Sequence, residues 1–184
     1  FHSYPLVDGT SKEKAKELTK LLNRYQFDST LLMVPFGQIQ QRLIVSTPPE
    51  YRVILYRRFM VRISELLGIK YGAKAIVTGE SLGQVSSQTI ENISVIDKAV
   101  KELPIIRPLI GMDKDSIISR ARKIGSYNIS IIPDQDCCSL FVPKHPVTKG
   151  SLKSVEAIEK DLPILKMIEE TVDLTEAIGF HWPN

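Results

Sequence analysis

Short, continuously apolar runs alternate along this chain with longer segments in which apolar residues recur at helical spacing. Short apolar runs that end near Pro or Gly are typical of strands buried on both faces of a sheet. The predicted strands are residues 31–34, 75–78 and 104–110. The longer segments each carry one broad apolar face, which is the pattern of a surface helix. The predicted helices are residues 11–25, 37–45, 50–70, 85–101 and 113–124.

The last third of the chain has shorter elements. Asp113 is placed to cap the helix that follows it, and Gly125 is placed to end that helix. Residues 129–132 read ISII, which predicts one more short strand. From about Ser154 the pattern predicts a helix-rich tail, interrupted by Pro163.

The alternation of strands and helices predicts βαβ units, in which parallel strands form a sheet that helices cover. We therefore expect an α/β fold with a three-layer, doubly wound, Rossmann-like parallel sheet and a helical C-terminal tail. Ligands of such folds bind beyond the carboxyl ends of the strands. Because glycine and polar residues are concentrated at those ends in this sequence, we expect the functional site there.

The composition narrows the class of protein. The chain has 184 residues, of which 43% are hydrophobic and 24% charged, and this is typical of a globular protein. No apolar run approaches the ~18 residues of a membrane span, and no secretory signal is recognisable. The net charge of +3 is compatible with a nucleic-acid partner but does not establish one. The chain opens with FHSYPLVDG and no initiator Met, so we expect an N-terminal portion to be missing.

Cys137 and Cys138 are the two cysteines of the chain, and they are adjacent. A disulfide between them is disfavoured, because neighbouring Cα atoms lie about 3.8 Å apart and an unstrained bridge needs roughly 4.4 Å or more. Structural zinc is disfavoured because only three histidines accompany them. A reactive thiol and plain packing remain, and two free cysteines predict a reducing, cytoplasmic environment.

The segment TGESLGQVSSQT, residues 78–89, follows a predicted strand and leads into a helix. Gly79 and Gly83 would let the backbone approach a ligand closely, and the N–H groups that follow suit a phosphate. A capped strand-turn-helix without a ligand explains the same spacing. Glu80 in this segment could bind magnesium or satisfy the turn, and the sequence does not choose between these roles.

Four motifs together resemble one family. They are RRFM at 57–60, TGESLGQVSSQT at 78–89, RPLIGMDK at 107–114 and DCCSLFVPKHP at 136–146. In this order they resemble the tRNA 4-thiouridine synthetases, which also serve thiamine biosynthesis. The resemblance covers Phe1 to about Thr148. It implies that residues 1–150 are a partial pyrophosphatase-loop (adenine nucleotide α-hydrolase-like) domain, and that residues 151–184 are a helical extension.

The resemblance implies an ATP-dependent tRNA sulfurtransferase. Such enzymes use ATP and Mg²⁺ to adenylate a uridine of tRNA, and sulfur from a persulfide then displaces AMP to give 4-thiouridine. The sulfur can also supply the thiazole of thiamine. The implied partners are tRNA and a cysteine desulfurase as persulfide donor. A membrane is not expected, and a homodimer remains open.

The resemblance also assigns site residues, and no metal ligand is among them. The ATP-binding residues that it implies are Phe1, Arg57, Gly79 and Gln88, with Phe1 beside the adenine. Without it, Arg57 would be read as part of a solvated basic helix face and Gln88 as a surface amide.

The resemblance implies catalytic roles for Lys114 and the cysteines. Lys114 matches the lysine tied to adenylation, where a cation could neutralise charge that develops at phosphorus. Cys137 is implied to handle sulfur, with Cys138 as the alternative because the match there is ambiguous by one residue. An exposed lysine and a buried, inert cysteine are the competing interpretations.

One part of the family pattern is missing. The serine- and glycine-rich phosphate loop, of the form SGGxDS, does not occur in this sequence, nor do the first strand and first helix beside it. Because its amides hold the phosphates, we predict that this chain alone does not adenylate. A non-catalytic nucleotide- or RNA-binding scaffold of the same fold is the alternative. Another adenylating enzyme of the superfamily, such as an amidotransferase, is a third hypothesis.

Overall fold

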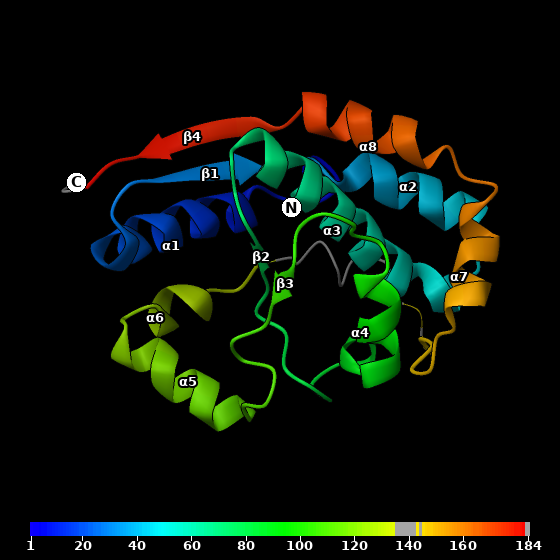
Figure 1. Cartoon of the computed structure of the whole chain (residues 1–184). Helices are drawn as coiled ribbons and strands as arrows, with labels where there is room; N and C mark the ends of the chain where they lie inside the picture. The colour runs from blue at the N-terminus through cyan, green and yellow to red at the C-terminus, as the bar shows by residue number, and fades with distance from the viewer. Residues whose placement is uncertain (135–142, 144, 183–184) are drawn as a thin grey trace.

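The computed structural model describes residues 1–134, 143 and 145–182 (Figure 1). The helices are α1 (Thr10–Gln26), α2 (Gly37–Ser46), α3 (Arg52–Lys70), α4 (Ile90–Asp97), α5 (Lys114–Lys123), α6 (Tyr127–Ser130), α7 (Leu152–Glu159) and α8 (Ile164–Asp173), with single 3₁₀ turns η1 (Pro49–Tyr51) and η2 (Ser86–Gln88). The strands are β1 (Ser29–Met33), β2 (Ile76–Val77), β3 (Ile105–Ile106) and β4 (Glu176–Phe180).

The strands form a parallel pair and an antiparallel pair. β2 and β3 are parallel, with Ile76 opposite Ile105. β1 and β4 are antiparallel, and His2 adds a parallel bridge to Pro35 beyond the end of β1. Neighbouring residues of a strand point to opposite faces, and Met33 and Val34 are both buried, so helices cover both sides of the chain here. The α/β class with a parallel sheet is confirmed.

The core lies between the strands and α3, the longest helix of the described chain. It is completed by side chains from α2, α4, α7 and α8. Leu55, Phe59 and Ile63 recur at a spacing of four on the buried face of α3. Asp113 caps α5 as expected, since it accepts a hydrogen bond from the Ser116 N–H at 2.7 Å, and Gly125 has a positive φ of 83° just beyond that helix.

Some sequence predictions were wrong. Residues 129–132 do not form a strand, because the chain turns at Gly125 and Tyr127–Ser130 becomes the short helix α6. The helix expected at 85–101 is shorter, since Thr89 caps it and α4 covers Ile90–Asp97. The tail contains the expected helices and then strand β4, which was not predicted.

A buried ion cluster, formed by Arg58, Arg62 and Glu159, connects the C-terminal tail to α3. Glu159 of α7 accepts two hydrogen bonds from Arg58, both at 2.8 Å, and two from Arg62, at 2.7 and 2.8 Å. Arg58 also donates to the carbonyl of Val95 on α4. Burial alone would raise the pKa of Glu159, but the two guanidinium groups outweigh it and hold the pKa at about 2. The cluster therefore contains an ionised carboxylate at neutral pH.

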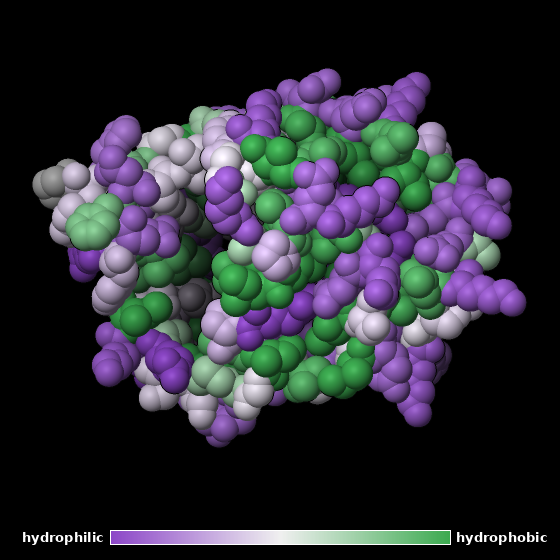
Figure 2. Space-filling model, in the orientation of Figure 1, coloured by the Kyte–Doolittle hydropathy of each residue, from purple (hydrophilic) through white to green (hydrophobic). Residues whose placement is uncertain are grey.

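One face of the β2–β3 pair is open. Val77 is 66% exposed and Ile106 is 51% exposed, although their neighbours Ile76 and Ile105 are partly covered. Figure 2 shows hydrophobic surface gathered at the centre of the view, over this pair of strands. The helices of the described chain include none with the length and apolar character that a membrane crossing needs.

Candidate functional site

The carboxyl ends of β2 and β3 place two polar residues side by side. Thr78 directly follows β2, Arg107 directly follows β3, and the Thr78 N–H donates to the carbonyl of Ile106 at 3.0 Å. α3 begins at the same end of the molecule and contributes Arg57 from its second turn. The topology thus brings Arg57 and Arg107 to the edge of the sheet where α/β proteins bind ligands.

Glu80 holds these two guanidinium groups together. Glu80 is 2% exposed, and its side chain accepts hydrogen bonds from Arg57, from Arg107 Nε at 2.6 Å and from Thr78 Oγ1 at 2.9 Å. Burial alone would raise the pKa of Glu80, but the charge of Arg57 and the hydrogen bond from Arg107 keep that pKa below its usual value. Because both carboxylate oxygens serve these donors, the structure favours the turn role of Glu80 over the magnesium role.

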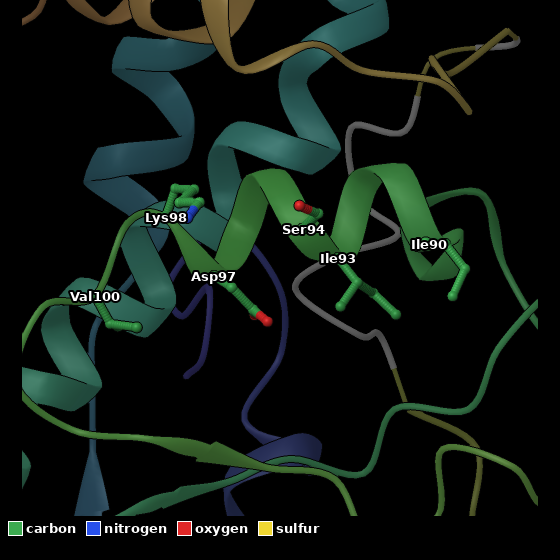
Figure 3. A pocket seen from close by; sticks show the side chains of 6 residues that line it. All are labelled: Ile90, Ile93, Ser94, Asp97, Lys98 and Val100. Carbon is green, nitrogen blue, oxygen red and sulfur yellow. The ribbon is translucent and has the colours of Figure 1, made fainter.

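Arg107 was missed as a site residue. It lies in RPLIGMDK, inside the run 104–110 that was predicted as one strand, and a cation within a run of apolar residues and prolines was the signal that could have indicated it. Besides Glu80, it donates to both carboxylate oxygens of Asp97 on α4. Figure 3 shows Asp97 projecting from α4 into a cavity of about 510 Å³ that Ile90 and Ile93 also line. Arg107 is therefore held in place by two carboxylates, those of Glu80 and Asp97. Arg57 makes fewer hydrogen bonds than Arg107 to side chains of the described residues.

Residues 78–89, here called the glycine segment because they contain Gly79 and Gly83, lie against the segment that carries Lys114. Ser81 Oγ donates to the carbonyl of Met112 at 2.6 Å, and the Leu82 N–H donates to the carbonyl of Ile110 at 3.0 Å. Lys114, two residues after Met112, is exposed in the first turn of α5. A Cβ added to Gly79 would meet no atom within 4 Å, so the backbone of Gly79 borders open space. Gly79 and Lys114 are thus brought to one edge.

Gln88 belongs to the same loop. The N–H of Gly83, which has a φ of 74°, donates to the carbonyl of Gln88 at 2.9 Å and closes the loop. The Oε1 atom of Gln88 is buried and has no hydrogen-bond partner among the described residues. A buried acceptor without a donor costs stability, so this atom is suited to accept a bond from a ligand.

Phe1 is set apart from this cluster. Its ring packs edge-on against Phe36 with 5.6 Å between centroids, and Phe36 packs edge-on against Tyr56, the residue before Arg57. Phe1 also borders an apolar cavity of about 300 Å³ between α3 and the residues before β2. The link from Phe1 to Arg57 therefore runs through aromatic packing.

Asn92 attaches a further segment to the site. It is fully buried, and its Nδ2 donates to the carbonyls of Ser86 at 2.7 Å and Val147 at 2.8 Å. Its Oδ1 accepts from the Gly150 N–H at 2.8 Å. The residues that follow the cysteine motif are thereby fixed beside Gln88. Cys137 and Cys138 themselves lie outside the described residues.

Comparison with known families gives a match over most of the chain. The family profile of the thiamine biosynthesis protein (ThiI) matches residues 1–164. The similarity thus continues past residue 150, where the motif resemblance was expected to fade.

Individual relatives agree with this match. A probable tRNA sulfurtransferase of Thermus thermophilus is 46% identical over 184 residues, which are 100% of this chain and 45% of that protein. A probable tRNA sulfurtransferase of Moorella thermoacetica is 46% identical over 178 residues, covering 97% of this chain and 45% of the relative. The chain thus spans about half the length of the curated relatives it matches.

A solved structure matches the fold. It is a crystal structure of a 4-thiouridine synthetase in complex with RNA and with ATP bound. The TM-score is 0.91 at 35% sequence identity, and the match covers 98% of this chain and 47% of the other. The arrangement of helices and strands around the site is thus shared with a protein that binds both ATP and RNA.

Proposed function

This chain belongs to the thiamine biosynthesis protein (ThiI) family, and we propose that it is the ATP-binding part of an ATP-dependent tRNA sulfurtransferase. The reaction adenylates a uridine of tRNA and replaces its oxygen by persulfide sulfur, giving 4-thiouridine, and the same sulfur supplies the thiazole of thiamine. The observation that carries the proposal is the Arg57–Glu80–Arg107 cluster beside the open backbone of Gly79. Its position at the carboxyl ends of parallel strands suits a nucleotide.

The described residues fit ATP in three respects. Arg57 presents a guanidinium group, whose planar fork suits phosphate oxygens. Gly79 leaves space for close backbone approach, and Gln88 offers a buried acceptor to the amino group of a base. We assign Phe1 to the adenine side of the site, because its ring is coupled to the helix of Arg57 through Phe36 and Tyr56.

Lys114 is proposed to act in the adenylation step. The uridine oxygen attacks the α-phosphorus of ATP, the bond to the β-phosphate oxygen breaks, and pyrophosphate leaves. Negative charge shifts onto the leaving pyrophosphate, and an ammonium group beside it lowers the barrier. Support comes from the hydrogen bonds that hold the Met112–Lys114 segment against the glycine segment.

Sulfur transfer is assigned to Cys137, with Cys138 as the alternative. A cysteine desulfurase transfers sulfur to this cysteine, which becomes a persulfide, and the outer sulfur of that persulfide attacks C4 of the adenylated uridine while AMP leaves. A thiol reductant then attacks the cysteine sulfur, so the S–S bond to the uridine breaks, 4-thiouridine is released and the cysteine is left in a disulfide with the reductant. The hydrogen bonds of Asn92 to Val147 and Gly150 support this assignment, because Asn92 also bonds to Ser86 and so holds the segment after the cysteines beside the loop of Gln88.

The proposal includes further components that belong to the complete enzyme. These are Mg²⁺ with the ATP, a phosphate loop with its strand and helix, tRNA as substrate, a cytoplasmic location and a homodimer. The exposed face of Val77 and Ile106 supports the phosphate-loop unit, because a buried parallel sheet needs a covering layer there. Residues 1–150 would then form the nucleotide domain and residues 151–184 its extension.

The function is tested by separating the two half-reactions. The protein translated from the complete native reading frame is incubated with ATP, Mg²⁺ and unmodified tRNA, and pyrophosphate release is measured. We expect release that depends on tRNA, and that persists in Cys137→Ala because adenylation needs no thiol. ATP binding without tRNA-dependent pyrophosphate release would contradict the proposal and favour the non-catalytic scaffold.

Replacing Gly79 by alanine should weaken ATP binding without unfolding the protein. The new Cβ meets no protein atom within 4 Å, so the cost falls on the ligand that approaches the backbone. We expect the Kd for ATP to rise about tenfold, which corresponds to ~1.4 kcal/mol. Titration calorimetry measures it. Gly111→Ala is the matched control, since its Cβ also meets nothing within 4 Å, and equal weakening by both variants would refute the role of Gly79.

A further inference from the structure

One end of the molecule exposes three large aromatic side chains. Tyr25 is 60% exposed, Phe27 is 67% exposed and Trp182 is 41% exposed. Phe27 follows α1 directly, and Trp182 is joined to that region because its N–H donates to Asp28 Oδ1 at 2.8 Å. These three residues are here called the aromatic surface. The ends of α1 and β4, which they follow or belong to, lie toward the left of Figure 1.

Phe27 occupies a backbone conformation that glycine would adopt more easily. Its φ is 61° and its ψ is −131°, and within the described residues it is the one non-glycine residue with a positive φ. A bulky side chain in that region costs stability, whereas glycine has no such cost. The ring faces solvent, so core packing does not account for it. A strained and exposed aromatic side chain indicates a binding role.

Cations surround the aromatic surface. Lys20 and Arg24 line a groove of about 390 Å³ together with Trp182. Tyr25 Oη donates to the carbonyl of Ile124 at 3.3 Å, which joins this end of α1 to the end of α5. The exposed cations of that end of α5 are Arg120, Arg122 and Lys123. Two acidic groups of this region are already engaged, Glu17 by Lys20 and Asp28 by Trp182.

We propose that the aromatic surface binds a single-stranded segment of RNA. Bases stack on Phe27 and Trp182, and phosphates contact Arg24 and the cations at the end of α5. The excess of cations favours RNA over a protein partner, because the phosphates of a nucleic-acid strand repeat a negative charge that such a basic surface neutralises. The proposal rests on the proposed function in that it takes RNA to be the substrate.

The geometry relates this surface to the nucleotide site. α5 has 10 residues and is therefore about 15 Å long, with Lys114 at one end and Lys123 at the other. RNA held at the aromatic surface can run along α5 toward the glycine segment. The aromatic surface is thus a positioning site for the substrate, distinct from the residues that contact ATP.

The test combines RNA affinity with thermal stability. A fluorescein-labelled single-stranded RNA of mixed sequence is titrated with the 184-residue protein at low salt, and anisotropy gives the Kd. Phe27→Gly is compared with Tyr71→Ala, which removes an exposed aromatic ring at the end of α3. We expect Phe27→Gly to raise the Kd about tenfold, because one base loses the aromatic ring on which it stacks. We expect the same variant to raise Tm by a few degrees, because glycine adopts the positive φ without strain.

The paired result separates binding from structure. A residue that merely supports the fold would lower Tm when it is replaced, whereas Phe27→Gly should raise Tm and lose RNA affinity. The proposal would be overturned if the Kd for RNA stayed unchanged in Phe27→Gly, which is also the result expected if the surface contacts another protein. It would equally be overturned if Tyr71→Ala lost as much RNA affinity as Phe27→Gly. Pyrophosphate release is measured separately, so failure of the proposed function does not mimic failure here.

Discussion

Replacing Glu159 by alanine should destabilise the protein by about 3–5 kcal/mol, because it leaves the buried Arg58 without its carboxylate partner. Arg58 is 2% exposed and cannot recover its hydration without local unfolding. Since domains are stable by roughly 5–15 kcal/mol, the loss should be visible as a large fall in the urea midpoint.

The same carboxylate makes stability depend on acid. The pKa of Glu159 falls from its usual 4.5 to about 2 on folding, so its contribution is complete above pH 4.5 and disappears as the pH falls toward 2. That contribution is ~3 kcal/mol, and Glu159→Ala should lack this acid-dependent part. Glu170→Ala is the control, because its pair with Arg42 is partly exposed and should be worth at most about 1 kcal/mol. Similar losses for both variants would contradict the assigned role of the cluster.

Replacing Lys114 by methionine should reduce tRNA-dependent pyrophosphate release at least ~100-fold, as the loss of one charge-stabilising group does. Methionine keeps most of the side-chain length and removes the charge. Because Lys114 is exposed, the urea midpoint should stay unchanged.

Lys153 provides a matched control for this experiment. It is also exposed in the first turn of a helix, α7, and the proposed function gives it no role. Lys153→Met should retain full pyrophosphate release. If Lys114→Met releases pyrophosphate as fast as Lys153→Met, Lys114 has no part in adenylation.

Local signals in the sequence predicted much of the fold. The apolar runs at 75–78 and 104–110 contain β2 and β3, and the run at 31–34 overlaps the second half of β1. Asp113 and Gly125 bound α5 as expected, because capping depends on residues within one turn of the helix end. Short apolar runs are ambiguous, however. The first two residues of ISII are part of the helix α6 and the last two follow its end, because the surroundings of such a run decide its conformation.

Long-range partners could not be read from the sequence. Glu159 and Arg58 are 101 positions apart, and strand β4 pairs with β1 from the other end of the chain. In the site, too, the contacts within one motif could be predicted and those between distant segments could not. Gly79 and Gln88 lie in one visible motif, whereas the bonds from Arg57 and Arg107 to Glu80 depend on three separate segments. The strain at Phe27 has no sequence signal, because phenylalanine rarely takes that conformation.

The central claim, ATP-dependent thiolation of tRNA, is tested most directly by forming the product. The protein from the complete native reading frame is incubated with ATP, Mg²⁺, unmodified tRNA and a persulfide-generating cysteine desulfurase, and 4-thiouridine is read from its near-ultraviolet absorbance. We expect ATP-dependent thiolation that is lost in Cys137→Ala and in Lys114→Met. ATP binding without thiolated tRNA, or full thiolation in both variants, would contradict the account.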